Sequence, residues 1–345
     1  MTNAILSMIC QQAYIDHIPL SATMEIVDAC NFRCIHCYIP EEKRAQILPT
    51  TDALHFIDQI KEAKTLYLTI TGGEPLLHKD FVTIYKYAHQ KGFSITLFTN
   101  GSLFEEQHFS LLAEYPPNRI EITLYGFSEN TYKRLTGHSG FNKVIRNVEQ
   151  LLSKKIPVML KYIILNENKD DLSAVIAFCR SHKLKLKTDS FLIFSEETDD
   201  DTHQISIDEH WRISEVVDSQ YPYNQTQFDE LYLDFINSMH PATDLFRCGA
   251  GLVSCWLTPS NQLALCNFMP EYSVDLNNVH FNTAWEMLKE MRLKQLPQKL
   301  PPESPCNNCS VREQCMVCPA KNRVIKNDLM CRNVCARFCE YARKP

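Results

Sequence analysis

The sequence lacks two features that would place the protein in or across a membrane. No run of about 18 apolar residues occurs, so no membrane-spanning helix is expected. The N-terminus, MTNAILSMICQQAYIDHIP, has no basic segment ahead of a long apolar core, so a secretory signal is not expected. These absences favour a cytoplasmic protein that has no membrane partner.

The sequence also lacks an excess of basic residues. Lys and Arg number 35 against 41 Asp and Glu, which gives a net charge of −6. A nucleic-acid-binding domain shows a basic face, so no nucleic-acid partner is expected. The 345 residues, 45% of them hydrophobic, are enough for one large domain and a smaller one.

Cysteine, by contrast, is abundant and unevenly distributed. Of the 15 cysteines, three lie at 30–37 and ten between 248 and 339, while Cys10 and Cys179 are isolated. Because no export signal is present, these cysteines are interpreted as metal ligands or free thiols and not as a disulfide framework.

Strand-like and helix-like segments alternate along the first half of the chain. Strands are predicted at 21–27, 66–71, 93–98, 119–124, 157–165 and 184–194. Helices are predicted at 51–64, 81–90, 103–114, 142–152 and 172–182. This alternation predicts an α/β fold with a parallel sheet. We expect an incomplete, six-unit (β/α)6 barrel of the TIM type; a doubly wound open sheet is the alternative.

The composition divides the chain into four parts. Residues 1–20 form an N-terminal lead with no clear period, and 21–195 form the partial barrel. Residues 196–245 form a bridging region with helices expected at 207–220 and 227–239. Residues 246–345 form a small Cys-rich domain of short hairpins and helices, with a clear turn at 258–261.

The stretch Cys30-Asn31-Phe32-Arg33-Cys34-Ile35-His36-Cys37 directly follows the first predicted strand. Its three thiols can bind one metal centre from a single loop. Iron–sulfur clusters are held by compact runs of this kind, and zinc is the rival because thiolates suit both metals. A structural zinc usually has four ligands, whereas this run supplies three.

A second motif, Thr71-Gly72-Gly73-Glu74-Pro75, ends the second predicted strand. The glycines have no side chain, so the backbone can approach a ligand closely. The Glu74 carboxylate can accept hydrogen bonds from an ammonium group. The alternative is an ordinary turn between strand and helix.

Together the two motifs resemble those of the radical S-adenosylmethionine (SAM) superfamily, and the resemblance covers residues 21–190. It implies a [4Fe-4S] cluster on the three thiols of the loop, with SAM bound to the fourth iron and its ammonium held at Gly72, Gly73 and Glu74. His36 occupies the place of the family's usual aromatic residue. Reductive cleavage of SAM would yield a 5′-deoxyadenosyl radical, which abstracts a hydrogen atom from the substrate.

The resemblance gives further strand ends possible roles in cofactor binding. Asn100 follows the third strand and is expected in the adenosine pocket, and Thr123 is expected near the SAM ribose. Lys161 lies within the fifth strand, where it faces either the SAM carboxylate inside the barrel or solvent at an edge. No catalytic residue is assigned.

The second group of cysteines resembles the SPASM extension of radical SAM enzymes, which holds auxiliary [4Fe-4S] clusters; structural zinc is the alternative. The resemblance implies one cluster on Cys248, Cys266 and Cys318, with Cys255, in an apparent strand, as a possible fourth ligand. It implies a second cluster on Cys306, Cys309, Cys315 and a late cysteine. Cys339 is preferred for this last ligand over Cys331 and Cys335.

These resemblances imply an enzyme that abstracts hydrogen from a residue of a ribosomally synthesised precursor peptide, or of a protein, and forms a thioether, C–C, C–O or C–N crosslink. The alternatives are a peptide epimerase, a formylglycine-forming sulfatase maturase, a tetrapyrrole-modifying enzyme and an inactive metal carrier. Since only about twenty residues precede the first strand, a separate leader-binding protein is a possible partner. The reductant would be a flavodoxin or ferredoxin.

Overall fold

The computed structural model describes residues 2–37, 39, 44–189, 239–309, 312–314 and 318–320. Its centre is one nine-stranded sheet in the order β6-β5-β4-β3-β2-β1-β7-β8-β9. The strands are β1 (Ser21–Glu25), β2 (Tyr67–Thr71), β3 (Ser94–Thr99), β4 (Arg119–Leu124), β5 (Val158–Ile163), β6 (Lys185–Asp189), β7 (Ser254–Leu257), β8 (Gln262–Ala264) and β9 (Ser273–Asp275).

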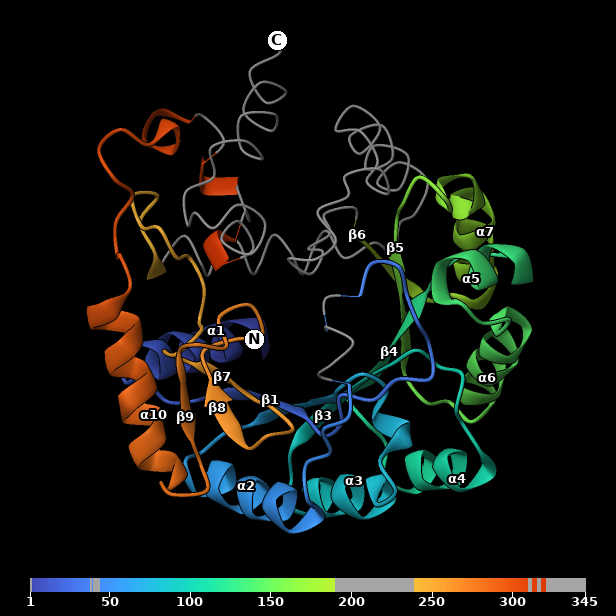
Figure 1. Ribbon diagram of the computed structural model, residues 1–345, viewed down its shortest axis with the longest axis horizontal. Helices are drawn as coiled ribbons and strands as arrows, with labels where there is room; N and C mark the ends of the chain where they lie inside the picture. The colour runs from blue at the N-terminus through green and yellow to red at the C-terminus, as the bar shows by residue number, and fades with distance from the viewer. Residues whose placement is uncertain are drawn as a thin grey trace.

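The helices of the described residues lie mostly outside this curved sheet (Figure 1). They are α1 (Thr2–Ile15), α2 (Thr50–Glu62), α3 (Phe81–Gln90), α4 (Glu106–Glu114), α5 (Glu129–Thr136), α6 (Phe141–Ser153), α7 (Leu172–His182) and α10 (Phe281–Glu290). None of them is long and apolar enough to cross a membrane.

The first six strands are parallel and follow one another in chain order across the sheet. A doubly wound sheet reverses its strand order at a switch point, and this sheet does not. The connecting helices therefore cover one face, as in a barrel that does not close (Figure 1). The predicted partial barrel of the TIM type is confirmed.

The two faces of the sheet have different chemistry, because side chains alternate along each strand. On the face beneath the helices, residues such as Met24, Ile70 and Leu97 are completely buried. The register places Thr23, Thr69 and Thr96 side by side on the opposite face. The inner face of the partial barrel is thus polar, and the apolar core lies between the sheet and the helices.

The sequence predicted a strand around residue 255 and a turn at 258–261, and both are confirmed. Strands β7 and β8 form an antiparallel hairpin in which the Thr258 amide donates to Gln262 O over 3.0 Å. The parallel pairing of β7 with β1, which places Cys255 opposite Ala22, was not predicted from the sequence. The Cys-rich part of the chain therefore extends the barrel sheet itself.

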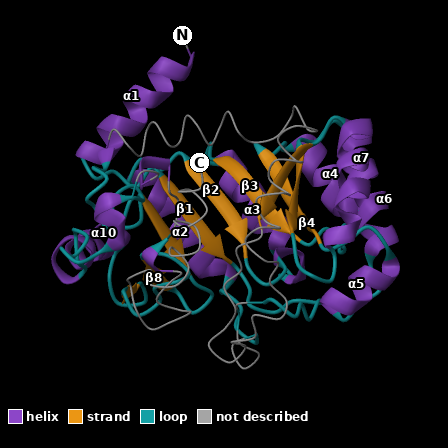
Figure 2. Ribbon diagram, turned by 90° about the horizontal axis from the view of Figure 1, so that it is seen from above, coloured by secondary structure: helices purple, strands orange, loops and turns teal. Residues whose placement is uncertain are grey.

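Three helices have no counterpart among the expected elements. The lead was expected to be irregular, yet Thr2–Ile15 is helical and projects away from the body of the molecule (Figure 2). Short α5 lies in a connection that was not assigned, and α10 packs on the outside against α2 and β9. The helices expected at 207–220 and 227–239 lie outside the described residues.

Helix α10 is attached to the barrel by a buried polar contact. The Gln59 side chain of α2 accepts a hydrogen bond of 2.7 Å from the Phe281 backbone amide. This amide is at the helix N-terminus, where no intrahelical acceptor exists. The Phe56 and Phe281 rings lie 5.8 Å apart beside this contact.

Replacing Gln59 by Ala should therefore destabilise the fold. The buried Phe281 amide would lose its acceptor, which costs about 1–3 kcal/mol of unfolding free energy. Urea denaturation measures this loss. The matched control is Gln90→Ala on exposed α3 surface, which should change stability by no more than about 0.5 kcal/mol. Equal losses of unfolding free energy in Gln59→Ala and Gln90→Ala would contradict a stabilising role for the Gln59–Phe281 hydrogen bond.

Candidate functional site

The Cys loop lies at the C-terminal end of β1, where active sites of such barrels are found. Backbone hydrogen bonds fix it from two sides. The amides of Gly73 and Glu74 donate to Val27 O and Ala29 O over 2.7 and 2.9 Å. On the other side, the amides of Arg33 and Ile35 donate to Thr136 O and Leu135 O at the end of α5.

This anchoring brings the three predicted cluster ligands together. Burial, together with the neighbouring charges of Cys30 and Cys37, raises the pKa of Cys34 to about 12. Burial also raises the pKa of the Cys30 thiol, with the Cys37 charge acting in the same direction. Three half-buried thiols that oppose each other's ionisation become thiolates together when a cationic iron centre compensates their charge. The donor set fits an iron–sulfur cluster.

Three neutral donors are directed at these sulfur atoms: the side chains of Asn100 and Tyr125, which follow β3 and β4, and one backbone amide of the loop itself. The Asn100 amide nitrogen lies 3.8 Å from Cys30 Sγ, and the Phe32 amide lies 3.4 Å from the same atom. A side-chain hydrogen bond from Tyr125 lowers the pKa of Cys34, against the larger effect of burial. Tyr125 was not among the predicted residues, although its place directly after β4 is a signal that could have found it.

The predicted aromatic position is occupied by a buried imidazole. His36 is 8% exposed, and its ring centroid lies 5.5 Å from that of Tyr125. Phe32 is packed edge-on against the same Tyr125 ring at 6.0 Å. Two side chains of the Cys loop, Phe32 and His36, therefore pack against the Tyr125 ring.

The glycine pair of the second motif is needed for a contact within the protein. A Cβ atom at Gly72 would lie 2.2 Å from Val27 O, and one at Gly73 would lie 2.4 Å from Asp28 O. Both distances are too short for real atoms. The sequence suggested close approach of the backbone to a ligand; the approach in the structure is to the segment that leads into the Cys loop.

Glu74 is completely buried between the ends of β2 and β3. Its carboxylate accepts hydrogen bonds of 2.7 Å from Thr99 Oγ1 and from the Asn100 amide, and one of 3.2 Å from the Leu76 amide. Burial raises the Glu74 pKa to about 7, against the effect of these hydrogen bonds. Its use as a SAM ammonium acceptor stays a prediction.

Asn100 links the third strand to the Cys loop. Its Nδ2 donates to Asn31 Oδ1 over 2.9 Å, and its Oδ1 accepts from the Ser102 amide and hydroxyl. Asn31 Nδ2 in turn donates to Ser102 Oγ. This closed set of polar contacts fixes the loop over the end of β3, where the adenosine pocket is expected.

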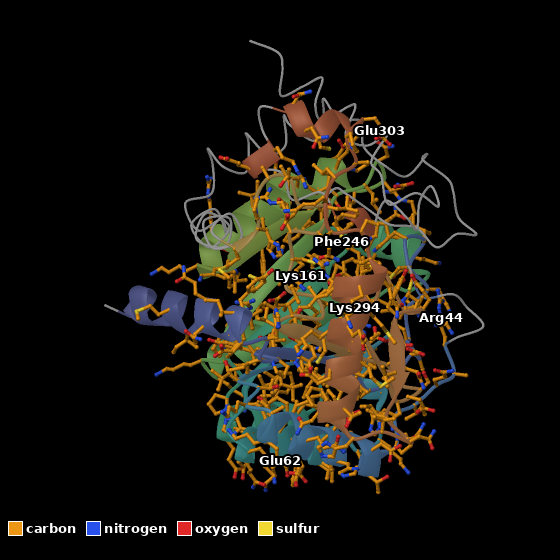
Figure 3. All side chains as sticks on the ribbon, turned by 90° about the vertical axis from the view of Figure 1, so that its left-hand side faces the viewer. Arg44, Glu62, Lys161, Phe246, Lys294 and Glu303 are labelled. Atoms are coloured by element: carbon orange, nitrogen blue, oxygen red, sulfur yellow. The ribbon has the colours of Figure 1, made fainter. Side chains whose placement is uncertain are left out.

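The register places Thr123 opposite Lys161 on the polar inner face of the barrel. Lys161 is therefore no outward edge residue (Figure 3). Its ammonium lies 2.5 Å from Glu121 Oε2 and 3.2 Å from the centroid of the Phe98 ring. Arg119 Nε bonds the other Glu121 oxygen over 2.6 Å.

The charges of Lys161, Glu121 and Arg119 act strongly on one another. Burial favours the neutral form of Glu121, but Lys161 and Arg119 outweigh burial and hold the Glu121 pKa below its ordinary value. Burial lowers the pKa of Lys161, while Glu121 acts in the opposite direction. Glu121 is thus the partner of Lys161 in the structure; contact of Lys161 with the SAM carboxylate stays a prediction.

The structure brings three cysteines of the C-terminal part together. The thiols of Cys248, Cys266 and Cys318 act on each other electrostatically, and burial raises the pKa of Cys266 to about 12. Cys255 is not grouped with them, because it lies on β7 with its side chain on the apolar face, and burial alone raises its pKa to about 12.

The remaining predicted ligands are only partly described. Cys306 lies within a short helical turn, Pro305–Asn308, and Cys309 directly follows it; the Cys309 amide donates to Cys306 O over 3.3 Å. Cys315, Cys331, Cys335 and Cys339 lie outside the described residues. Within the described ranges, no three His, Cys, Asp or Glu side chains converge tightly enough for a single metal ion.

Gly73→Ala should displace the Cys loop. The new methyl group would lie 2.4 and 2.5 Å from the carbonyl oxygens of Asp28 and Ala29, so the backbone must move. We expect iron binding after anaerobic reconstitution to fall at least severalfold, measured by iron content. The control is Gly92→Ala, where the nearest atom is Lys61 Nζ at 3.7 Å and only the positive φ of 81° opposes the change. Full iron binding by Gly73→Ala would contradict the contact.

Lys161→Met should destabilise the barrel, since buried Glu121 would keep only Arg119 as partner. We expect a loss of roughly 2 to 4 kcal/mol at neutral pH, measured by urea denaturation. The Glu121 pKa is lowered in the folded state, so its contribution is present above the ordinary value of 4.5 and is lost in more acidic solution.

The difference in unfolding free energy between the parent and Lys161→Met should consequently become smaller in acidic solution. Lys185→Met, which removes an exposed ammonium from adjacent β6, serves as the control. A parent-like unfolding free energy for Lys161→Met at neutral pH would disprove the coupling.

Two curated relatives align with most of the chain. It is 20% identical to an AdoMet-dependent heme synthase of Methanosarcina barkeri over 90% of this chain and 94% of that protein. It is 22% identical to the mycofactocin maturase MftC of Mycolicibacterium smegmatis over 86% of this chain and 77% of that protein.

Two solved structures share the fold. The structure of anSMEcpe with bound AdoMet superposes with a TM-score of 0.74 at 15% identity and covers 94% of this chain and 92% of that one. Streptococcus suis SuiB bound to its precursor peptide SuiA superposes with a TM-score of 0.70 at 14% identity, over 94% and 78% of the two chains.

The motif-bearing barrel also matches a family model. The match, to the radical SAM superfamily, runs over residues 24–179 and so contains the Cys loop and the Gly72–Gly73 turn. Over these residues the barrel is similar to the radical SAM superfamily, and its fold is shared with these two structures.

Proposed function

We propose that the protein modifies a ribosomally synthesised precursor peptide, abstracting a hydrogen atom from one residue and forming a thioether, C–C, C–O or C–N crosslink. One observation carries the proposal: the structure holds two separate groups of three thiols. One group lies at the end of β1, and the other lies in the Cys-rich part that extends the same sheet. Initiating a radical reaction requires one centre, so a second centre is available for the electron released in bond formation.

In this proposal Cys30, Cys34 and Cys37 hold a [4Fe-4S] cluster. SAM is held by the turn at Gly72, Gly73 and Glu74, with His36, Asn100, Thr123 and Lys161 around it. When both are bound, the cluster and SAM together supply a 5′-deoxyadenosyl radical. The chain's own groups orient the cluster: Asn100 and Tyr125 direct hydrogen bonds to its thiolates, which is how outer contacts tune such centres.

The Cys-rich part of the chain is proposed to hold two auxiliary [4Fe-4S] clusters in a SPASM domain. Cys248, Cys266 and Cys318 hold one of them, and Cys255 does not complete its ligand set, because its side chain faces the apolar side of β7. Cys306 and Cys309, with Cys315 and Cys339, are proposed for the other. Thiols in such number remain reduced in the cytoplasm, where we place the enzyme.

The polar inner face of the barrel suits a peptide substrate. Its threonine and charged side chains offer hydrogen bonds to a backbone, and SuiB, which shares the fold, was crystallised with its precursor peptide. The relative MftC is likewise named a maturase. A separate leader-binding protein and a flavodoxin or ferredoxin reductant complete the proposal; an epimerase and a formylglycine-forming maturase remain alternatives within the same chemistry.

A second candidate substrate is a tetrapyrrole. It is favoured by the 20% identity to an AdoMet-dependent heme synthase, which extends over 90% of this chain. In that case the radical would abstract a hydrogen atom from a porphyrin side chain, and the mass of a precursor peptide would not change.

The central test is Cys34→Ala. The parent, reconstituted anaerobically and reduced with dithionite, should form 5′-deoxyadenosine from SAM, and the variant should form less than about one hundredth as much, because the first cluster loses a ligand. Cys179→Ala, a core cysteine on α7, is the matched control and should retain cleavage.

The peptide assignment is tested by mass spectrometry of a candidate precursor peptide coexpressed with the parent and with Cys34→Ala. Loss of two hydrogen atoms with the parent alone supports crosslinking, whereas an unchanged mass with an altered stereocentre supports epimerisation. Parent-level SAM cleavage by Cys34→Ala would refute the cluster assignment.

A further inference from the structure

Arg292 is a buried cation in the turn that continues α10. The turn, Met291–Gln295, has π-helical hydrogen bonding, and Arg292 is 3% exposed. Its Nη1 donates to Gln298 Oε1 over 3.0 Å and its Nη2 donates to Phe246 O over 3.2 Å. Its Nε is buried, and no group of the described residues accepts a hydrogen bond from it.

Within the part of the chain that the structure describes, no carboxylate lies within 4.0 Å of this guanidinium. Asp244, which lies on the same segment as Phe246, pairs instead with Lys299 at 2.5 Å and with His240 at 3.3 Å. A buried charge without a counter-charge is costly by several kcal/mol. The location of Arg292 therefore requires an anion that these side chains do not supply.

Arg292 packs against the segment that carries Cys248. A Cβ atom at Gly251 would lie 3.1 Å from Arg292 Cβ and 2.4 Å from Leu265 Cδ2, and Gly251 has a positive φ of 71°. Gly251 lies three residues after Cys248 in the sequence, and Leu265 directly precedes Cys266. The stem of Arg292 thus lies beside the Gly251 loop that follows Cys248, and its guanidinium binds the carbonyl of Phe246, two residues before Cys248 (Figure 3).

The electrostatics agree with this placement. Burial raises the pKa of the Cys248 thiol, and the Arg292 charge acts to lower it. Arg247, which directly precedes Cys248, is a second buried cation; its guanidinium donates to Arg312 O and Glu313 O, and it acts on His240 together with Arg292. Burial lowers the His240 pKa and raises the Tyr14 pKa to about 12, so both are neutral at physiological pH; their side chains are joined by a contact of 2.9 Å.

We infer that Arg292 is the built-in counter-charge of an anionic iron–sulfur centre on Cys248, Cys266 and Cys318, and that it raises the reduction potential of that centre. The inference rests on the auxiliary cluster of the proposed function. Uptake of one electron from a reductant adds one negative charge to the centre. A buried guanidinium beside the thiolates stabilises the reduced form more than the oxidised form, because few solvent molecules screen it.

The role assigned to Arg292 is therefore that of a positioning residue that acts through the cluster. It does not require Arg292 to touch the substrate. Within this π-helical turn Arg292 is buried, while Lys294 remains 72% exposed.

The test is an EPR-monitored redox titration of anaerobically reconstituted full-length protein, with dithionite as reductant. The signal that disappears in Cys266→Ser identifies the centre. Arg292→Met should lower the reduced-to-oxidised ratio of this signal at a fixed potential at least tenfold, which equals 59 mV for one electron. Arg292→Lys, which retains the charge, should change this reduced-to-oxidised ratio less than threefold.

Lys294→Met is the matched control, because it removes an exposed charge from the same turn and should leave the midpoint unchanged. Arg292→Gln, which is neutral but retains a donor for Phe246 O, replaces Arg292→Met if the latter fails to bind iron. A parent-like midpoint in a neutral Arg292 variant with full iron content overturns the inference and leaves the proposed function intact. Absence of any iron–sulfur signal that depends on Cys266 overturns both.

Discussion

The site depends on one close contact between two stretches of backbone. The turn after β2 lies so near the segment after β1 that its Gly73 amide bonds Val27 O over 2.7 Å and leaves no space for a methyl group. This contact holds the Cys loop at the sheet edge. It also brings Glu74 into reach of Thr99 and Asn100, so the ends of three neighbouring strands form one rigid unit. The two sequence motifs are therefore two sides of a single packing contact.

Much of this arrangement could be predicted from the sequence because it is local or periodic. The bounds of β4, α3 and α7 agree with the predicted ones, since apolar residues recur there at the spacing of a strand or a helix. The short α5 was missed because it has few apolar residues. Its boundaries are given by capping instead: Ser128 accepts from the Thr131 amide, and Gly137 ends the helix in a left-handed conformation.

Contacts between distant parts of the chain could not be predicted in this way. A strand at Cys255 was expected, but its parallel pairing with β1 depends on the three-dimensional path of the chain. The same holds for Arg292, since nothing in its local sequence distinguishes it from exposed Lys294. Its character follows from burial against the Gly251 loop. The two groups of thiols have different partners: the first receives hydrogen bonds from Asn100 and Tyr125 and is acted on by the Arg44 charge, whereas the buried Arg292 charge acts on the second.

The position of β1 has a consequence for how the chain folds during synthesis. β1 lies between β2, which follows it closely in sequence, and β7, which is made much later. Until β7 emerges from the ribosome, one edge of β1 presents unsatisfied backbone amides and carbonyls, which can pair with another chain. Joining strands so distant in sequence is also slow, because a long loop must close first. The strand that leads into the Cys loop is thus among the first to form and among the last to be protected from aggregation.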